Sequence, residues 1–508
     1  MYSLPNATKN ERFGQLCRSF RKQKTRCRIY SVDPSLTIDY SSEAQVIYYG
    51  TLLVYRGGDT DSNGRIASSG LKFTEYYNKD QDRKIGLSAT TQIEVSFIND
   101  DGAMASFDWG YDAVVYLDIY DSDNAEWLTC PLGVFEWETP DSISKEIVSA
   151  TAYNFMNRLG NTESLISNED YSESPTLYDI TYRYYGGDGG YMGMKFGIPN
   201  DGSTFPYKSK TYSSLPYDDS GMSARDSLEK IAEINWKNAY VDRTATIRFR
   251  SWAYLPNYPS RPEAHVVWTI SADTVPSHIK KLKIAEYNVP KITAVSAEIG
   301  QIGASAKSGS GDEVYRIYDN GFFRPKNDLE SICEHIRSGL TSLFNTTYRP
   351  ITVELLEGDP RIEGGDLVSI TKGGTNYLLP VFQQTIEWRG GTFKQTLMSF
   401  GRRSIQDNGY ASNKEHNISS RIYNASSQVG IESMRSVASG STDTIDVSFG
   451  VPFNFVPKVV ACLFSSQTVG MGQCSASVYN ITTTGFSLRL TNNYSVSRDI
   501  GATWIATT

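Results

Sequence analysis

The stretch Glu357-Gly358-Asp359-Pro360-Arg361-Ile362-Glu363-Gly364-Gly365-Asp366-Leu367-Val368-Ser369-Ile370 combines two turn signals with the start of a strand. The pairs Asp359-Pro360 and Gly364-Gly365 favour turns. Val368 and Ile370 share one face of the strand that Asp366 opens, because alternate residues of a strand point the same way. The sequence therefore predicts a tight corner that leads into a half-buried strand. Asp359 and Asp366 are interpreted as turn and strand-entry residues rather than catalytic acids.

Strand patterns flank this corner on both sides. Residues 287–404 contain a strand candidate at 292–295 and a helix candidate that begins at Asp328, with one apolar face made of Leu329, Ile332, Cys333, Ile336, Leu340 and Leu343. Residues 31–155 carry candidate strands at 92–97, 113–120, 132–137 and 146–153. Short strands separated by Gly and Asp turns predict a β-barrel.

The two β regions also resemble each other. Residues 110–115 parallel residues 364–369, and the pair Glu136-Trp137 corresponds to Glu387-Trp388. With a duplicated barrel, three chains would form a ring of six similar units, which suits docking on a six-fold tube. Chance similarity between short β segments is the alternative interpretation.

The remaining segments differ in pattern. Residues 156–286 are mixed, with a helix predicted from Ser223 and a hairpin over 239–249. In 405–440, heptad-like spacing indicates a short coiled coil or an isolated amphipathic helix, with the seam residues Ile418, Ile422, Ala425 and Val429. Residues 441–508 return to strand patterns.

Composition narrows the class of protein. A chain of 508 residues should hold several domains, and a net charge of −8 argues against a general nucleic-acid binder. The six cysteines are scattered and form no CxxC pair, which predicts free thiols, with a Cys462–Cys474 bridge as the less favoured alternative. There is no run of 18 apolar residues and no secretory signal pattern. Residues 1–30 are strongly basic, and we interpret them as a solvated arm or surface helix, with docking on an acidic ring or facing DNA as the sharper alternative.

Candidate chemistry is sparse. Residues 59–66 match the first half of a calcium loop, but Gly70 stands where a bidentate Glu is needed, so a polar turn is favoured. No zinc-protease, nucleophile-elbow or Walker-type motif occurs. The four histidines, His265, His278, His335 and His416, lie far apart in the sequence. We therefore predict no catalytic residues, no metal and no cofactor.

One surface candidate lies near the end of the chain. Asn492, Asn493, Tyr494 and Arg498 fall on turns that we expect to be exposed, and exposed loops commonly carry binding residues. Phe486 and Trp504 are expected in the core of a small sandwich rather than at a sugar-stacking site. These four turn residues are the receptor-binding candidates.

The order of the motifs resembles that of bacteriophage tail-tip hub proteins. Asn320-Gly321-Phe322-Phe323, the helix, Tyr348-Arg349-Pro350, Gly358-Asp359-Pro360 and Gly365-Asp366 follow one another as they do in that family. Residues 453–460, Thr483-Thr484-Gly485-Phe486 and Trp504-Ile505-Ala506 resemble the small lectin-like β-sandwiches of phage fibre tips.

The resemblance implies a mainly β fold with an α+β insertion and two tail-hub β-barrels. The expected domains are 1–30 (basic N-terminal arm), 31–155 (first hub β-barrel), 156–286 (inserted α/β domain), 287–404 (second hub β-barrel), 405–440 (helical or coiled-coil linker) and 441–508 (C-terminal lectin-like β-sandwich).

The function implied by the resemblance is structural. A homotrimeric ring at the virion tail tip would close the tail tube, contact the distal tube rings and the tape-measure protein, and open for genome ejection. The C-terminal domain would attach to a host cell-surface glycan or protein. The chain would be made in the host cytoplasm, would not be an enzyme and would show no sequence-specific nucleic-acid binding. The competing interpretations are a glycan hydrolase with a C-terminal binding module, which needs two carboxylates facing a cleft, and a plain cell-surface adhesin.

Overall fold

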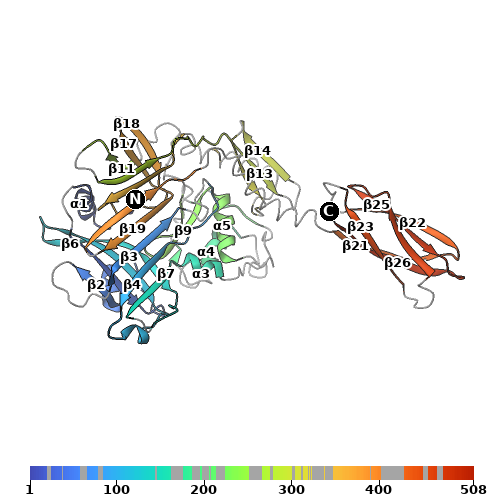
Figure 1. Ribbon diagram of the computed structural model, residues 1–508, viewed down its shortest axis with the longest axis horizontal. Coiled ribbons are helices and arrows are strands. Elements are labelled where there is room, and N and C mark those ends of the chain that lie inside the picture. Colours follow the sequence, from blue (N-terminus) through green and yellow to red (C-terminus); the bar gives the residue numbers. More distant parts are fainter. Residues whose placement is uncertain are drawn as a thin grey trace. The chain divides into compact units, whose positions relative to one another are not determined.

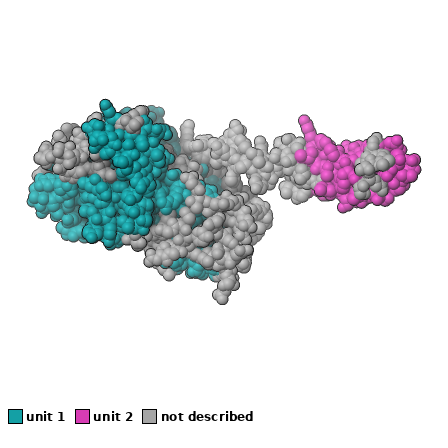
Figure 2. Space-filling view, turned by 90° about the horizontal axis from the view of Figure 1, so that it is seen from below, with its two compact units in different colours: residues 1–405 teal, residues 406–508 magenta. Residues whose placement is uncertain are grey.

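The structure is a computed structural model in which the chain divides into two compact units, Met1–Ile405 and Gln406–Thr508 (Figure 1, Figure 2). The described residues are 1–19, 24–36, 38–57, 66–77, 84–143, 146–161, 175–185, 195–196, 205, 207–212, 223–250, 266–274, 278–299, 304–310, 313–318, 320, 322, 337, 347–389, 391–401, 428–449, 456–465 and 473–507.

The first unit is built on one 11-stranded sheet. Across the sheet its strands are β12 (Ile279–Ile284), β16 (Ile351–Leu356), β20 (Thr392–Met398), β19 (Gln383–Arg389), β3 (Ile66–Tyr76), β4 (Gln92–Ile98), β7 (Ile147–Tyr153), β6 (Glu126–Trp137), β5 (Asp112–Asp121), β1 (Thr25–Val32) and β2 (Thr51–Gly57). Alternating apolar residues explain several of these strands, since β4 and β20 each bury every second side chain.

Strands from the two predicted barrels pair directly with each other. β19 lies antiparallel to β3, with Gln384 opposite Glu75 and Trp388 opposite Leu71. Gly70 (φ +78°) lies beside this junction, where a Cβ atom would come within 1.8 Å of the Trp388 carbonyl oxygen. The mainly β fold class is confirmed, but the described strands are paired in an open order, with β12 and β2 at its ends. Of the segment 59–66, for which the sequence predicts a polar turn rather than a calcium loop, only Ile66 lies within the described residues.

Smaller sheets complete the first unit. They contain β11 (Val266–Ser271), β17 (Leu367–Lys372) and β18 (Thr375–Pro380); β14 (Ala304–Gly309), β13 (Ala294–Ile299) and β15 (Val314–Tyr318); and β8 (Lys195–Phe196), β10 (Thr246–Arg250) and β9 (Asn238–Val241). The predicted strand from Asp366 is β17, which runs parallel to β11 and antiparallel to β18. The predicted hairpin over 239–249 is confirmed as β9 and β10.

The helices are short. They are α1 (Ala7–Arg18), α2 (Glu43–Tyr49), the 3-10 helix η1 (Ala103–Ser106), α3 (Met156–Asn161), α4 (Leu177–Tyr185) and α5 (Ala224–Ile234). Ser223 caps α5 by accepting a hydrogen bond from the Asp226 amide, as the sequence predicts. Apart from Arg337, the helix predicted over 328–343 lies outside the described residues.

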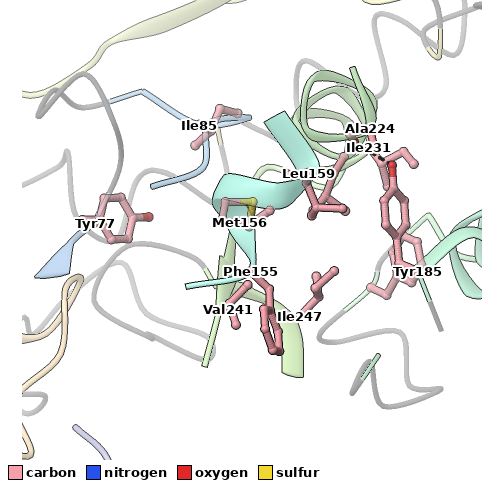
Figure 3. Close-up of a cluster of buried hydrophobic side chains, with 14 of the residues drawn as sticks. Tyr77, Ile85, Phe155, Met156, Leu159, Tyr185, Ala224, Ile231, Val241 and Ile247 are labelled. Atoms are coloured by element: carbon pink, nitrogen blue, oxygen red, sulfur yellow. Dashed lines mark hydrogen bonds between the residues drawn. The ribbon is translucent and has the colours of Figure 1, made fainter. Parts of the chain in front are cut away.

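The helices of the middle region pack around one apolar cluster (Figure 3). Met156 and Leu159 of α3 meet Ile231 of α5, and the Tyr185 hydroxyl of α4 donates a 2.8 Å hydrogen bond to the Ala224 carbonyl. Burial of such apolar side chains contributes about 1.5–3 kcal/mol each. This cluster therefore fixes the middle region onto the large sheet.

The described residues of the basic segment, 1–19 and 24–30, are integrated into the fold. Phe13 and Cys17 of α1 are buried, and β1 is an inner strand between β5 and β2. Arg12 pairs with Asp121, while Arg26 and Arg28 pair with Asp118. The described part of the basic segment is thus a packed surface helix and a strand, because acidic side chains of β5 neutralise its arginines.

The second unit is a sandwich of two sheets. One holds β21 (Gln428–Val437), β26 (Arg498–Thr507) and β23 (Lys458–Phe464); the other holds β22 (Ser441–Ser448), β25 (Gly485–Asn492) and β24 (Cys474–Tyr479). Phe449, Phe486 and Trp504 fill its core, as expected for Phe486 and Trp504. Cys462 and Cys474 are free thiols, as are the other described cysteines.

The predicted helical linker needs a correction. Residues 428–437 form strand β21 rather than a helix, with Val429 opposite Ile505 of β26. Pairing along a whole neighbouring strand outweighs the weak local helical pattern. Ile418, Ile422 and Ala425 lie outside the described residues, and the finer domain boundaries stay a prediction.

Trp388→Ala tests the junction between β19 and β3. Trp388 is 1% exposed and its indole N–H donates to Thr25 Oγ1 at 3.1 Å. We expect a loss of about 3–5 kcal/mol in the free energy of unfolding of the first unit, measured by calorimetry, with the transition of the second unit unchanged. Leu356→Ala is the control, because Leu356 is 51% exposed; equal effects of the two variants would contradict the prediction.

Candidate functional site

The corner at 357–370 contains a buried ion pair. Asp359 is fully buried, and Arg361 donates to its two carboxylate oxygens from Nε at 2.9 Å and from Nη2 at 2.6 Å. Burial acts to lower the pKa of Arg361, but its hydrogen bond to Asp359 and the charge of that carboxylate raise the pKa above the usual value. Both carboxylate oxygens of Asp359 accept hydrogen bonds from Arg361, so this side chain is not available as a general base.

This ion pair is also the anchor of the N-terminal segment. Arg361 Nη1 donates to the Asn10 carbonyl oxygen at 2.6 Å and to Asn10 Oδ1 at 2.8 Å. Its guanidinium carbon lies 5.2 Å from the centre of the Phe13 ring. The Tyr2 amide donates to the Arg361 carbonyl oxygen at 2.7 Å. The corner thus holds α1 in place.

Polar side chains of the junction strands bind the same corner. Gln395 of β20 donates to the Asp359 carbonyl oxygen at 2.9 Å, and Gln384 of β19 donates to Glu75 of β3 at 2.7 Å. Glu75 also accepts from the Gly364 amide at 3.2 Å. Every one of these groups is buried, so each bond replaces water that folding removed.

Two arginines of the β9–β10 hairpin region complete the network. Arg243 Nη2 donates to the Ile362 carbonyl oxygen at 3.0 Å, and Arg250 Nη1 lies 3.3 Å from Glu75 Oε1. Burial raises the pKa of Glu363, and the charge of Arg243 opposes that rise. A narrow hollow beside these groups is lined in part by Glu75, Arg243 and Glu363.

The network fits a structural joint better than a hydrolytic site. A glycan hydrolase needs two carboxylates that face a sugar. Glu75 faces Gln384, Gly364 and Arg250 instead, and Asp359 faces Arg361. Among the described residues no group of three His, Cys, Asp or Glu side chains could hold a metal ion.

The one described histidine also belongs to the packing. His278 is buried, with its ring nitrogens 3.3 Å from the Leu356 carbonyl oxygen and 3.2 Å from the Arg18 carbonyl oxygen. His265, His335 and His416 lie outside the described residues. Within the described part of the chain, no helix is both long enough and apolar enough to span a bilayer.

The receptor-binding candidates separate into two kinds of residue. Asn492 is fully buried, so its expected exposure was wrong. Its amide nitrogen donates to the carbonyl oxygens of Val437 and Val496 at 2.8 and 2.9 Å, and its Oδ1 accepts from the Tyr494 amide at 2.9 Å. A turn asparagine commonly binds the backbone of its own loop in this way, which the sequence pattern alone does not distinguish from a surface role.

The other candidates remain at the surface. Asn493 is exposed, and Tyr494 and Arg498 are partly exposed. The Arg498 guanidinium lies 4.3 Å from the centre of the Tyr494 ring. Asn493 and Tyr494 thus lie on the loop between β25 and β26, and Arg498, the first residue of β26, contacts the Tyr494 ring. Asn492, the last residue of β25, holds the backbone of that loop by hydrogen bonds.

Comparisons with known proteins follow the same division of the chain. Residues 444–507 match the family model of the H-type lectin domain. No curated protein matches the chain significantly.

Among solved structures, the chain is similar to the tail protein from Neisseria meningitidis MC58, with 8% identity, 74% of this chain and 96% of that chain covered, and a TM-score of 0.43. It is also similar to the 43 kDa tail protein of prophage MuSo2 from Shewanella oneidensis, with 10% identity, coverage of 74% and 98%, and a TM-score of 0.42. A smaller match is the R1-type pyocin tail fiber, with 13% identity, coverage of 16% and 69%, and a TM-score of 0.15. These neighbours are two tail proteins and a tail fiber.

Arg361→Met tests the buried ion pair. We expect the first unit to lose about 3–5 kcal/mol in its free energy of unfolding, because Asp359 is left as an uncompensated buried charge. The control is Arg389→Met at the exposed pair with Glu387, where Arg389 is 66% exposed and the expected cost is about 0–1 kcal/mol. Denaturant unfolding of both variants decides; similar costs would show that the buried pair is not the anchor.

A second comparison separates the two asparagines. Asn492→Ala should cost about 1–3 kcal/mol in the unfolding of the second unit, because it leaves buried carbonyl groups unpaired. Asn493→Ala should leave the thermal transition unchanged, since Asn493 is exposed. Equal transitions in calorimetry would contradict the structural role of Asn492.

Proposed function

We propose that the chain is a structural hub at the distal end of a phage or phage-like tail. In this proposal three copies form a ring that closes the tail tube, contacts the neighbouring tube rings and the tape-measure protein, and opens for genome ejection. The second unit attaches the particle to a host cell-surface glycan or protein. Support for the hub comes from the motif order around 320–366 and from the way the corner at 357–370 locks several segments into one body.

The observation that carries the attachment role is the match of residues 444–507 to the H-type lectin domain. The described residues of this range belong to the sandwich of the second unit, with Asn493 and Tyr494 on the loop between β25 and β26 and Arg498 at the start of β26. An amide, an aromatic ring and a guanidinium offer hydrogen bonds and a stacking face, which are the contacts that sugars use. We therefore assign the receptor-binding role to these three residues and leave Asn492 as their support.

The role in the tail is mechanical rather than catalytic. The buried carboxylates of the network are paired with arginines and amides, so the first unit is suited to transmit load between ring neighbours. Localisation at the virion tail tip follows from this proposal. Release of sugar from purified cell-wall glycan by the intact chain would instead favour the hydrolase alternative.

Removal of residues 406–508 tests whether the first unit suffices for assembly and the second unit is needed for attachment. We expect particles with the truncated chain to assemble normally, because the first unit has its own core, and to lose adsorption to host cells. A triple variant, Asn493→Ala with Tyr494→Ala and Arg498→Ala, should reproduce the adsorption loss without truncation. Binding of particles to cells is measured by counting free particles. Normal adsorption of the truncated particles would refute the attachment role.

A further inference from the structure

The helix α2 and the start of β2 direct apolar side chains toward solvent. In α2 only Val46 is fully buried, whereas Ile47, Tyr48 and Tyr49 are 47, 81 and 51% exposed, and Leu52 of β2 is 45% exposed. The rings of Tyr48 and Tyr49 meet edge to face, with centres 4.8 Å apart. We call these four exposed residues and their backbone the α2–β2 surface. Adjacent exposed tyrosines and aliphatic residues are typical of protein interfaces.

The α2–β2 surface includes the strand at one end of the large sheet. β2 is the last strand in the pairing order on this side, and it pairs only with β1 among the described strands (Figure 1). An end strand leaves alternate N–H and C=O groups ready to pair with another chain, and proteins commonly blunt such edges with lysines or bulges. In β2, Thr51 and Leu52 are exposed and uncharged, while its pairing with β1 has a bulge between Leu52 and Val54 and Arg56 lies near its end.

The opposite end of the sheet has the complementary character. β12 ends the pairing order there, and Lys280, Lys281 and Lys283 are exposed on it. Lys280 pairs with Glu354 at 3.1 Å, while Lys281 and Lys283 make no ion pair within the described residues. Two long cationic side chains therefore stand beside an unpaired strand edge.

Charge distinguishes the two ends. Residues 33–55 contain Asp33, Asp39 and Glu43 but no lysine or arginine. Glu43 binds Arg28 at 2.7 Å, and Asp33 and Asp39 make local hydrogen bonds within the segment that leads into α2. One edge is thus apolar and acidic, and the other is basic. Opposite charges across a contact speed association and reject wrong partners.

We propose that the α2–β2 surface of one chain docks on the β12 edge of a second copy of the same chain. This inference rests on the proposed ring and specifies its contact. A head-to-tail contact of this kind uses each edge once per chain and closes into a ring when the rotation between copies allows it. The aliphatic stems of Lys281 and Lys283 cover the tyrosine rings, and their ammonium groups face Asp33 and Asp39.

The two edges together favour a second copy of this chain as the binding partner. The two surfaces are on one chain, opposite in charge and at opposite ends of one sheet, so each chain supplies what its neighbour lacks. A partner protein of another sequence would explain the character of one of the two edges but not of the other.

Charge reversal in the full chain tests the contact. The wild-type chain should scatter light as a particle of about 170 kDa, three times the 56.6 kDa of one chain. Lys281→Glu with Lys283→Glu, or Asp33→Lys with Asp39→Lys, should each weaken assembly by about tenfold or more, because like charges then face each other. Combining both pairs of changes should restore assembly. Lys307→Glu, at an exposed lysine of β14, is the charge-matched control.

Cross-linking locates the contact independently of mass. In a Cys462→Ser background, a Tyr48→Cys chain is treated with a linker that joins a thiol to an amine, in an equal mixture of light and heavy isotope-labelled chains. We expect peptides that join position 48 of one isotope to Lys281 or Lys283 of the other. A trimeric mass with no such peptides and no effect of charge reversal overturns the inference and leaves the hub proposal standing. A wild-type chain that stays monomeric at micromolar concentration overturns both.

Discussion

The first unit depends on one buried ion pair, Asp359 with Arg361. Two charges removed from water are stable only when each is fully bonded, and here the bonds come from segments far apart in the sequence. Arg361 donates a hydrogen bond to Asn10 and lies against the Phe13 ring, while the Asp359 carbonyl oxygen accepts a hydrogen bond from Gln395. The corner therefore works as a specificity device. An arrangement of the strands that kept these segments apart would leave a buried charge without partners. Such an arrangement is therefore destabilised relative to the native one.

Much of this could be predicted from local pattern. The turn at Asp359-Pro360, strand β17, the cap at Ser223 and the core positions of Phe486 and Trp504 all follow from residues close together in the sequence. The direct pairing of β19 with β3 could not be predicted, because it depends on residues more than 300 positions apart. The same limit explains Asn492 and β21. A turn asparagine is equally suited to a receptor and to its own backbone, and the spacing around Val429 is compatible with a helix until β26 supplies a partner.

The two units are stabilised by different kinds of interaction. In the first, charged and amide side chains such as Glu75 and Gln384 are buried and bonded to one another at the joint between the β regions. In the second, an aromatic cluster around Phe449 fills a small sandwich, and the buried Asn492 binds backbone groups at its edge. A polar joint favours one unique arrangement, whereas a small apolar core tolerates variation in the loops above it.

The β19–β3 junction has a consequence for force. The strands lie antiparallel over the stretch from Gln383 to Trp388, so a pull along their length loads all the backbone hydrogen bonds between them at once, as shear. Breaking them in that geometry requires the bonds to fail together, whereas a pull across the strands would open them one after another. The backbone hydrogen bonds between β19 and β3 thus hold the two β regions of a chain together against a force along the strands. A force along these strands therefore moves the two β regions of one chain together.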